Sequence, residues 1–90
     1  MENTDEYAKL REQLTTMDWP QVYMFKFIVP AINKQIALVE SKFTDDAVLY
    51  QKESSNGKYI SITIKEVMLN PESVIDKYKE MKGIEGLMAL

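Results

Sequence analysis

The 90-residue chain contains no cysteine and no histidine. Without cysteine it can form no disulfide, and it has neither a thiolate nucleophile nor a sulfur ligand for a metal. Without histidine it lacks the commonest metal ligand and the commonest general base near neutral pH. We therefore expect no metal, no cofactor and no redox chemistry, and we expect that the protein is not an enzyme.

Basic residues and long apolar runs are also scarce. Lys and Arg together number 11 against 14 Asp and Glu, and the formal charge of −3 makes nucleic acid an unlikely partner, because phosphate backbones attract clustered cations. No apolar run approaches the roughly 20 residues of a membrane-spanning helix. The polar start MENTDE lacks the basic and apolar regions of a signal peptide. We expect a single soluble domain over residues 1–90, located in the cytoplasm, with no membrane partner.

An N-terminal helix is predicted before residue 18. Asn3 or Thr4 can cap it, and apolar residues then recur at helical spacing on one face, namely Tyr7, Leu10, Leu14 and Met17. Pro20 excludes a continuing helix because it lacks an amide hydrogen and biases Trp19 away from helical angles. The helix should therefore end near Asp18, and residues 1–18 form an element appended to the rest.

The segment VYMFKFIVP predicts a largely buried strand from Val22 to Val29, because aromatic and β-branched residues dominate it. Alternate residues of a strand point to opposite faces. Phe25 and Phe27 then share the core face with Tyr23 and Val29. The other face, marked as the wetter one by a lysine, carries Met24, Lys26 and Ile28.

Two further helices are predicted. Between residues 31 and 43, apolar residues step by four, three and four along one stripe, which consists of Ile32, Ile36, Val39 and Phe43. The second helix starts at Asn70-Pro71-Glu72, where a cap, a first-turn proline and an acid combine. Its buried face contains Val74, Ile75, Tyr78 and Met81, and Gly83 can end it in the left-handed conformation.

Residues 47–68 predict a β-hairpin around the loop SSNG, in which Asn56-Gly57 readily takes positive φ. Ile60, Ile62 and Ile64 share one face, whereas Tyr59, Ser61, Thr63 and Lys65 share the other. The register stays open at this point. A loop of two or four residues places Leu49 and Gln51 opposite the isoleucines, and a three-residue loop with a bulge places Val48 and Tyr50 there.

The order of elements after the first helix is strand, helix, strand, strand, helix, strand, with IEGLMAL as a short last strand. This order favours an α+β, ferredoxin-like fold: a four-stranded antiparallel sheet with two helices on one face, formed by residues 19–90. The isoleucines and phenylalanines then pack against the helices. The second face of the sheet is left open.

Three sequence features carry a resemblance to a known family. They are Trp19-Pro20, the pair Phe25-Lys26, and the hairpin pattern Ser54-Ser55-x-Gly57-x-Tyr59-x-Ser61. Over about residues 17–90 the chain resembles the YbeD-like family of small bacterial proteins of unknown function. It departs from that family at Val29 and Glu53, where many members have glycine and proline. The resemblance implies a ferredoxin-like sheet similar to that of ACT-type regulatory domains, and it supplies no catalytic residue.

Lys26, Tyr59 and Ser61 are the candidate binding residues, because the topology places them together on the open face. The main hypothesis is a regulatory or interaction domain whose partner is a protein or a second copy, with a small-molecule effector also possible. Single-stranded RNA is an alternative, since RNA-recognition motifs share this fold. Catalysis is a weaker alternative, with Glu53, Glu66, Lys26, Lys65 and Tyr59 as its candidates. An ordinary solvated sheet face would have the same residue types.

Overall fold

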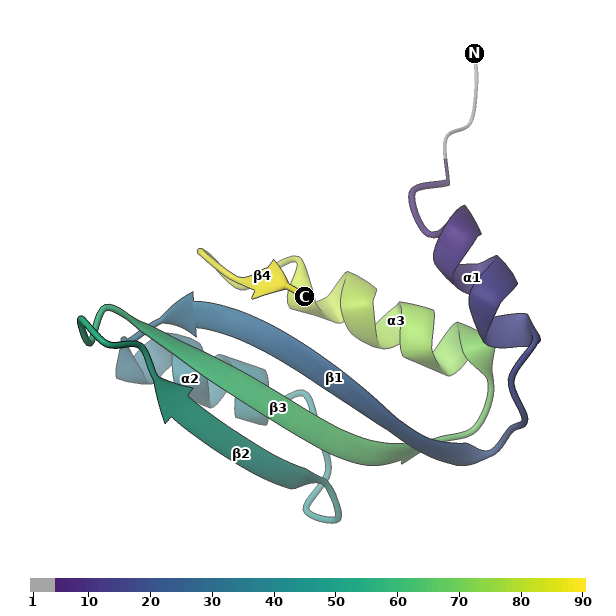
Figure 1. The fold of residues 1–90 in the computed structure, drawn as a ribbon, viewed down its shortest axis with the longest axis horizontal. Helices are drawn as coiled ribbons and strands as arrows, with labels where there is room; N and C mark the ends of the chain where they lie inside the picture. Colours follow the sequence, from purple (N-terminus) through teal and green to yellow (C-terminus); the bar gives the residue numbers. More distant parts are fainter. Residues whose placement is uncertain (1–4) are drawn as a thin grey trace.

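The computed structural model describes residues 5–90, which form three helices and four strands (Figure 1). In chain order they are α1 Ala8–Thr15, β1 Gln21–Pro30, α2 Asn33–Glu40, β2 Val48–Glu53, β3 Tyr59–Met68, α3 Pro71–Met81 and β4 Met88–Ala89. The predicted cap at Asn3 or Thr4 lies outside the described residues.

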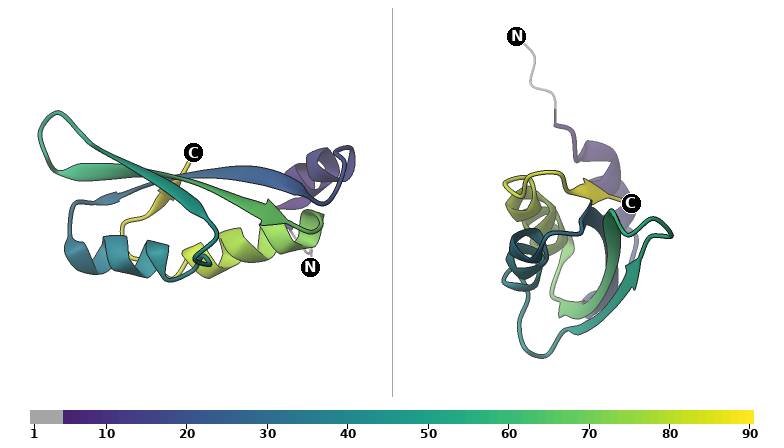
Figure 2. Two further views of the ribbon diagram at one scale, coloured as in Figure 1. Left: turned by 90° about the horizontal axis from the view of Figure 1, so that it is seen from below. Right: turned by 90° about the vertical axis from the view of Figure 1, so that its left-hand side faces the viewer.

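The four strands form one antiparallel sheet in the order β2-β3-β1-β4. Figure 2 shows α2 and α3 on one face of this sheet, with the opposite face uncovered. The two central strands are also the longest, and they pair along their whole length from Gln21 opposite Met68 to Pro30 opposite Tyr59. This arrangement confirms the predicted α+β, ferredoxin-like fold.

The core lies between the sheet and the helices. Phe25, Phe27, Ile62 and Ile64 are fully buried, as the period-two alternation predicts. The ring of Phe25 lies 5.4 Å from that of Phe43 and 5.4 Å from that of Tyr78, measured between centroids. From the helices, the fully buried residues are Leu14, Val39, Val74, Ile75 and Met81.

The hairpin register follows the first of the two predicted alternatives. Leu49 pairs with Ile64 and Gln51 with Ile62, and the amide of Ser54 donates to the carbonyl of Tyr59 at 2.9 Å. Four residues, 55–58, therefore form the loop. Gly57 takes the predicted left-handed conformation, with φ +71°. Positive φ at Asn56 is not confirmed, since among the described residues only glycines have positive φ.

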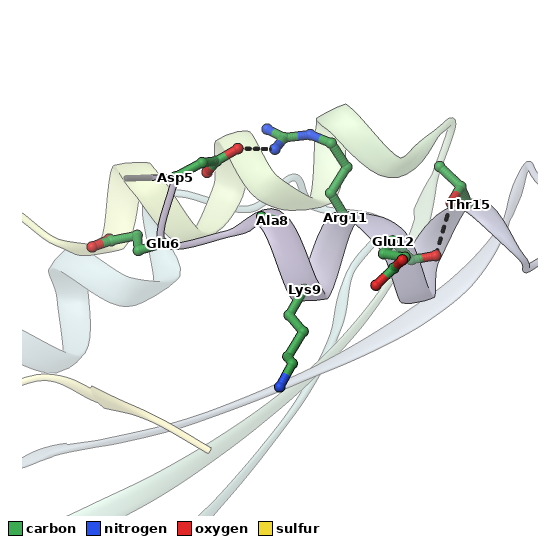
Figure 3. Close-up of a pocket in the computed structure, with 7 residues that line it drawn as sticks. All are labelled: Asp5, Glu6, Ala8, Lys9, Arg11, Glu12 and Thr15. Atoms are coloured by element: carbon green, nitrogen blue, oxygen red, sulfur yellow. Dashed lines mark hydrogen bonds and ion pairs between the residues drawn. The ribbon is translucent and has the colours of Figure 1, made fainter. Parts of the chain in front are cut away.

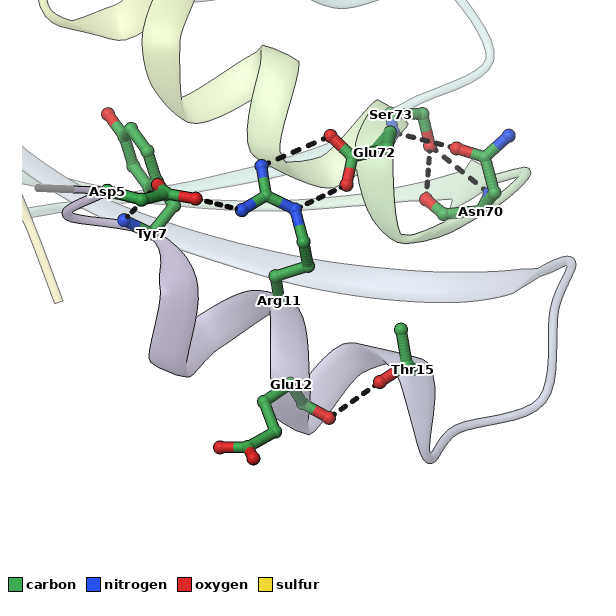
Figure 4. A network of polar contacts seen from close by, with 8 residues as sticks. All are labelled: Asp5, Tyr7, Arg11, Glu12, Thr15, Asn70, Glu72 and Ser73. Carbon is green, nitrogen blue, oxygen red and sulfur yellow. Dashed lines mark hydrogen bonds and ion pairs between the residues drawn. The ribbon is translucent and has the colours of Figure 1, made fainter. Parts of the chain in front are cut away.

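A polar network joins α1 to α3 (Figure 4). The Arg11 guanidinium donates from Nε to Glu72 Oε2 at 2.5 Å and from Nη2 to Glu72 Oε1 at 3.3 Å, and it also pairs with Asp5. The Arg11 side chain lowers the pKa of the Glu72 carboxyl through these hydrogen bonds. Beside it, Asn70 Oδ1 accepts from the amide of Ser73 at 2.8 Å, so the predicted cap of α3 is confirmed.

The N-terminal helix ends three residues earlier than predicted, at Thr15. The hydroxyls of Thr15 and Thr16 donate back to the carbonyls of Glu12 and Gln13. Such side-chain bonds compete with the backbone hydrogen bonds that would continue the helix. Met17 is consequently not on the buried helix face and is 38% exposed. The indole of Trp19 donates to the carbonyl of Leu14 at 2.8 Å, and the ring packs against the core.

The helix predicted over residues 31–43 is shorter and rotated. Ile32 precedes α2 in an extended conformation and is 55% exposed, so the prediction that it lies on the buried stripe is wrong. Gln35 is buried instead, and its Nε2 donates to the carbonyl of Glu85 at 2.8 Å. A glutamine paired in this way can be buried at little cost, which the apolar pattern does not reveal.

The end of α3 also differs from the prediction. Gly83 does not take positive φ; the left-handed glycine is Gly86, at φ +80°. A Cβ built on Gly86 would lie 2.7 Å from Pro30 Cγ, so the absence of a side chain allows this segment to approach the end of β1. Because the chain turns at Gly86, the last strand is confined to Met88–Ala89 rather than spanning IEGLMAL.

Candidate functional site

The register aligns the open-face residues of the long strands in cross-strand rows. One row is Met24, Lys65 and Val48; the next is Lys26, Thr63 and Tyr50; the third is Ile28, Ser61 and Lys52. At the edge of the sheet, β4 adds Met88 opposite Ile28. We call these rows, with Val22, Val67, Tyr59 and Leu90, the open face.

Most of the exposed large apolar side chains of the described residues lie on the open face. They are Val22, Met24, Val48, Tyr50, Tyr59, Val67, Met88 and Leu90, each between 45% and 66% exposed. Met17, Ile32 and Leu69 are the others of this kind. An exposed apolar surface that is contiguous, rather than scattered, is typical of an interaction site.

The structure places all three predicted binding residues on the open face but does not bring them into one cavity. Tyr59 and Ser61 line a surface hollow of about 340 Å³ together with Ile28, Lys52 and the hairpin residues Glu53, Ser54 and Ser55. Lys26 lies outside this hollow, in the row of Thr63 and Tyr50. The surface is thus broader than a pocket for a single small molecule.

Tyr50 and Lys52 are open-face residues that the sequence alone does not assign. Tyr50 shares a row with Lys26, with Thr63 between them, and its ring centroid is 5.9 Å from Nζ of Lys65 in the neighbouring row. Their position depends on the hairpin register, which the pattern leaves undecided. Once the four-residue loop is known, period two assigns both residues.

A second hollow, of about 710 Å³, is shallow and belongs to the solvent side of α1 (Figure 3). All its lining residues come from α1 or from the two residues Asp5 and Glu6, so no second element closes it. Figure 3 shows Arg11 directed to Asp5 and Lys9 pointing away from both. These side chains do not converge on a common point, and the hollow therefore presents no binding site.

The candidate catalytic residues lie on opposite sides of the sheet. Glu66 is on the helix side, where its Oε2 accepts from the amide of Thr44 at 2.9 Å and from its hydroxyl at 2.6 Å. Lys26, Lys65 and Tyr59 lie on the open face. The carboxylate of Glu66 thus holds Thr44, in the middle of the α2–β2 connection.

Within residues 5–90 no helix has the length and apolar character needed to cross a bilayer. Nor do three or more His, Cys, Asp or Glu side chains of these residues gather into a group suited to a metal ion.

Comparison with known proteins identifies the family. Residues 14–90 match the family model described as "Protein of unknown function (DUF493)". A UPF0250 protein of Haemophilus influenzae (strain PittEE) is 33% identical over 89 residues, covering 92% of this chain and 91% of the relative. A UPF0250 protein of Shewanella halifaxensis (strain HAW-EB4) is 29% identical over 75 residues, covering 79% and 85%. No solved structure matches significantly.

An open-faced α+β sandwich of this kind defines a small domain with one uncovered, partly apolar sheet face. The chain belongs to the DUF493 family of uncharacterised small bacterial proteins, as the YbeD-like resemblance of its sequence predicts.

Proposed function

We propose that this protein is a non-catalytic interaction domain that binds its partner through the open face of its sheet. The observation that carries the proposal is the concentration of exposed large apolar side chains on this face, from Val22 at one end to Tyr59 at the other. Burying such a surface against a partner is favourable, at roughly 25 cal/mol per Å² of apolar area removed from water.

The polar groups of the face support binding rather than catalysis. Tyr59 offers a large ring with a hydroxyl tip, which is typical of interface anchors. Lys26, Tyr59 and Ser61 have no carboxylate beside them in their rows. Acid/base chemistry needs two groups within hydrogen-bond reach of each other. Glu53 lines the same hollow as Tyr59 and Ser61, but no hydrogen bond among the described residues joins its carboxylate to either side chain.

Single-stranded RNA is the second candidate partner. Tyr50 and Tyr59 are both on the open face, and bases can stack on such rings. A small-molecule effector is a third, and the hollow beside Tyr59 and Ser61 supports it. Neither an RNA strand nor a small molecule in this hollow would bury the aliphatic side chains at the margins of the open face.

The test compares two double variants. Lys26→Ala, Tyr59→Ala removes a cation and an exposed apolar side chain from the open face. Lys34→Ala, Ile32→Ala removes the same two kinds of group around the start of α2, where both residues are exposed. Thermal melting checks folding, and native capture with mass spectrometry and sedimentation velocity report partners and oligomeric state.

We expect both variants to melt close to the wild type, and only the open-face variant to lose captured partners or change its sedimentation. If neither variant changes partners or assembly, the open face is ordinary solvated sheet and the proposal is wrong. If both double variants lose the same partners, binding does not depend on the open face, and this outcome also refutes the proposal.

A further inference from the structure

The charged residues at the strand positions of the open face are all of one sign, although Glu53 at the end of β2 lines the hollow beside Tyr59 and Ser61. The strand positions of this face carry Lys26, Lys52 and Lys65, and none of the Asp or Glu residues in the described strands shares that side. The whole chain is nevertheless acidic, with a formal charge of −3. The apolar surface thus coincides with a local cationic one.

We propose that the partner of the open face is an acidic segment of another protein in which carboxylates alternate with apolar side chains. This inference rests on the proposed function and adds the chemistry of the partner. Complementary charge gives such an interface its specificity and its rate of association, while the apolar contacts supply affinity.

The lysines are distributed one to a row. Lys65 lies between Met24 and Val48, Lys26 is two residues further along β1, and Lys52 is at the end of the third row. Successive rows are about 6.8 Å apart, because each is two residues further along an antiparallel strand. Because the lysines lie on three different strands, they are separated across the sheet as well as along it. Carboxylates at i and i+2 of an extended segment are about 6.8 Å apart, and those at i and i+4 of a helix about 6 Å, so a segment that crosses the strands obliquely can bring successive carboxylates near lysines of successive rows.

A second copy of this chain is a poorer occupant. Stacking two open faces brings the three lysines of each copy into one interface, and in the described strands only Glu53, at the hairpin end, offers a carboxylate beside that face. Like charges placed together in a desolvated interface are unfavourable. Other acidic groups that could neutralise them, such as Glu66 and Glu72, belong to the helix side of the molecule.

Nucleic acid is also a poorer occupant. Phosphate-binding faces depend mainly on clustered Lys and Arg, and single-strand sites add aromatic platforms. Here the exposed aliphatic side chains Val22, Met24, Val48, Val67, Met88 and Leu90 outnumber the lysines and tyrosines of the face. Aliphatic groups gain little from phosphates or ribose and much from the apolar side chains of a protein.

The experiment is an NMR titration of ¹⁵N-labelled protein with three probes. They are a synthetic peptide in which glutamate alternates with valine, a matched peptide with lysine in place of glutamate, and oligouridine. Each probe is titrated into the wild type, into Lys26→Glu, Lys65→Glu, and into a control, Lys34→Glu, Lys79→Glu. The control makes the same change in net charge at exposed positions on α2 and α3.

We expect the glutamate peptide to shift the resonances of open-face residues in the wild type. It should bind the Lys26→Glu, Lys65→Glu variant at least about tenfold more weakly than the wild type, because two surface attractions are lost and two repulsions are gained. The control variant should lose much less. The lysine peptide should bind the charge-reversed variant better than the wild type.

Four outcomes overturn the inference: equal binding of both peptides, no binding of either, tighter binding of oligouridine at the open face, or self-association of the free protein through this face. If one of these occurs while the Lys26→Ala, Tyr59→Ala variant still loses its captured partner, the interaction function stands and the partner's chemistry is wrong. If that variant loses nothing, the proposed function itself has failed.

Discussion

Ile62→Ala should be among the most damaging single substitutions in this protein. Ile62 is fully buried in β3, opposite Phe27 on one side and Gln51 on the other, and it faces the helices. Removing three carbons from such a site leaves a cavity and costs about 2–5 kcal/mol. A chain of this length has a total stability of about 5–13 kcal/mol, at roughly 0.05–0.15 kcal/mol per residue.

Thr63→Ala is the matched control, because it is the next residue of the same strand and points to the open face. Thr63 lies between Lys26 and Tyr50 and is half-buried. Its replacement removes a hydroxyl and a methyl group without opening a core cavity, so we expect a loss below about 1 kcal/mol.

Urea titration followed by far-UV circular dichroism and by the fluorescence of Trp19 measures both losses. With a slope of about 1–3 kcal/mol per M, a loss of 3 kcal/mol moves the midpoint by roughly 1–3 M. In thermal melts the same loss corresponds to a shift of roughly 12–24 °C for a domain of this size. Equal losses for the two variants would show that the assignment of the two sheet faces is wrong.

The remaining predictions concern Gly86 and Arg11. Gly86→Ala should lower the free energy of unfolding by more than about 1 kcal/mol, the cost typical of a strained backbone position. The reason is that φ is +80° and that the new Cβ would meet Pro30 Cγ at 2.7 Å. Gly83→Ala, whose Cβ meets nothing closer than 4.0 Å, should be neutral or stabilising in the same denaturant assay, and equal effects would contradict this reading. The Arg11 side chain holds the pKa of Glu72 below its ordinary 4.5, so this carboxylate contributes stability that is present above that pH and lost as the pH falls through the lowered value. Arg11→Met should reduce the slope of melting temperature against pH in this acidic window, whereas Lys9→Met, which removes the other cation of α1, should not; identical slopes for Arg11→Met and wild type would refute the role of this pair.

The fold is predictable from the sequence because its strongest patterns are local and agree with one another. Phe25 and Phe27 alternate with Met24 and Lys26, and both phenylalanines are fully buried. The cap at Asn70 and the positive φ of Gly57 follow from the chemistry of two or three adjacent residues. These three local features therefore form without help from distant residues, and tertiary packing only brings the elements together.

Two of the errors, in α2 and at the end of α3, occur where a long-range contact decides the local structure. Gln35 is buried because the carbonyl of Glu85, fifty residues away, accepts its hydrogen bond. Gly86 rather than Gly83 is left-handed because the turn must pass close to Pro30. A short window of the sequence does not contain the distant partner residue. Helical periodicity therefore assigned Ile32 to the core, and the position of Gly83 after the helix assigned it as the left-handed cap.

The open face shows how one turn determines the chemistry of a surface. Because side chains alternate along a strand, a slip of one residue in the hairpin would turn Leu49, Gln51 and Glu53 outward and bury Tyr50 and Lys52. The face would then lose a lysine and a tyrosine and gain a carboxylate. The four-residue loop, stabilised by Lys58 N donating to Asn56 Oδ1 at 3.0 Å and by the left-handed Gly57, excludes that slip. The cationic and apolar character proposed for partner binding therefore depends on turn residues that need not touch the partner.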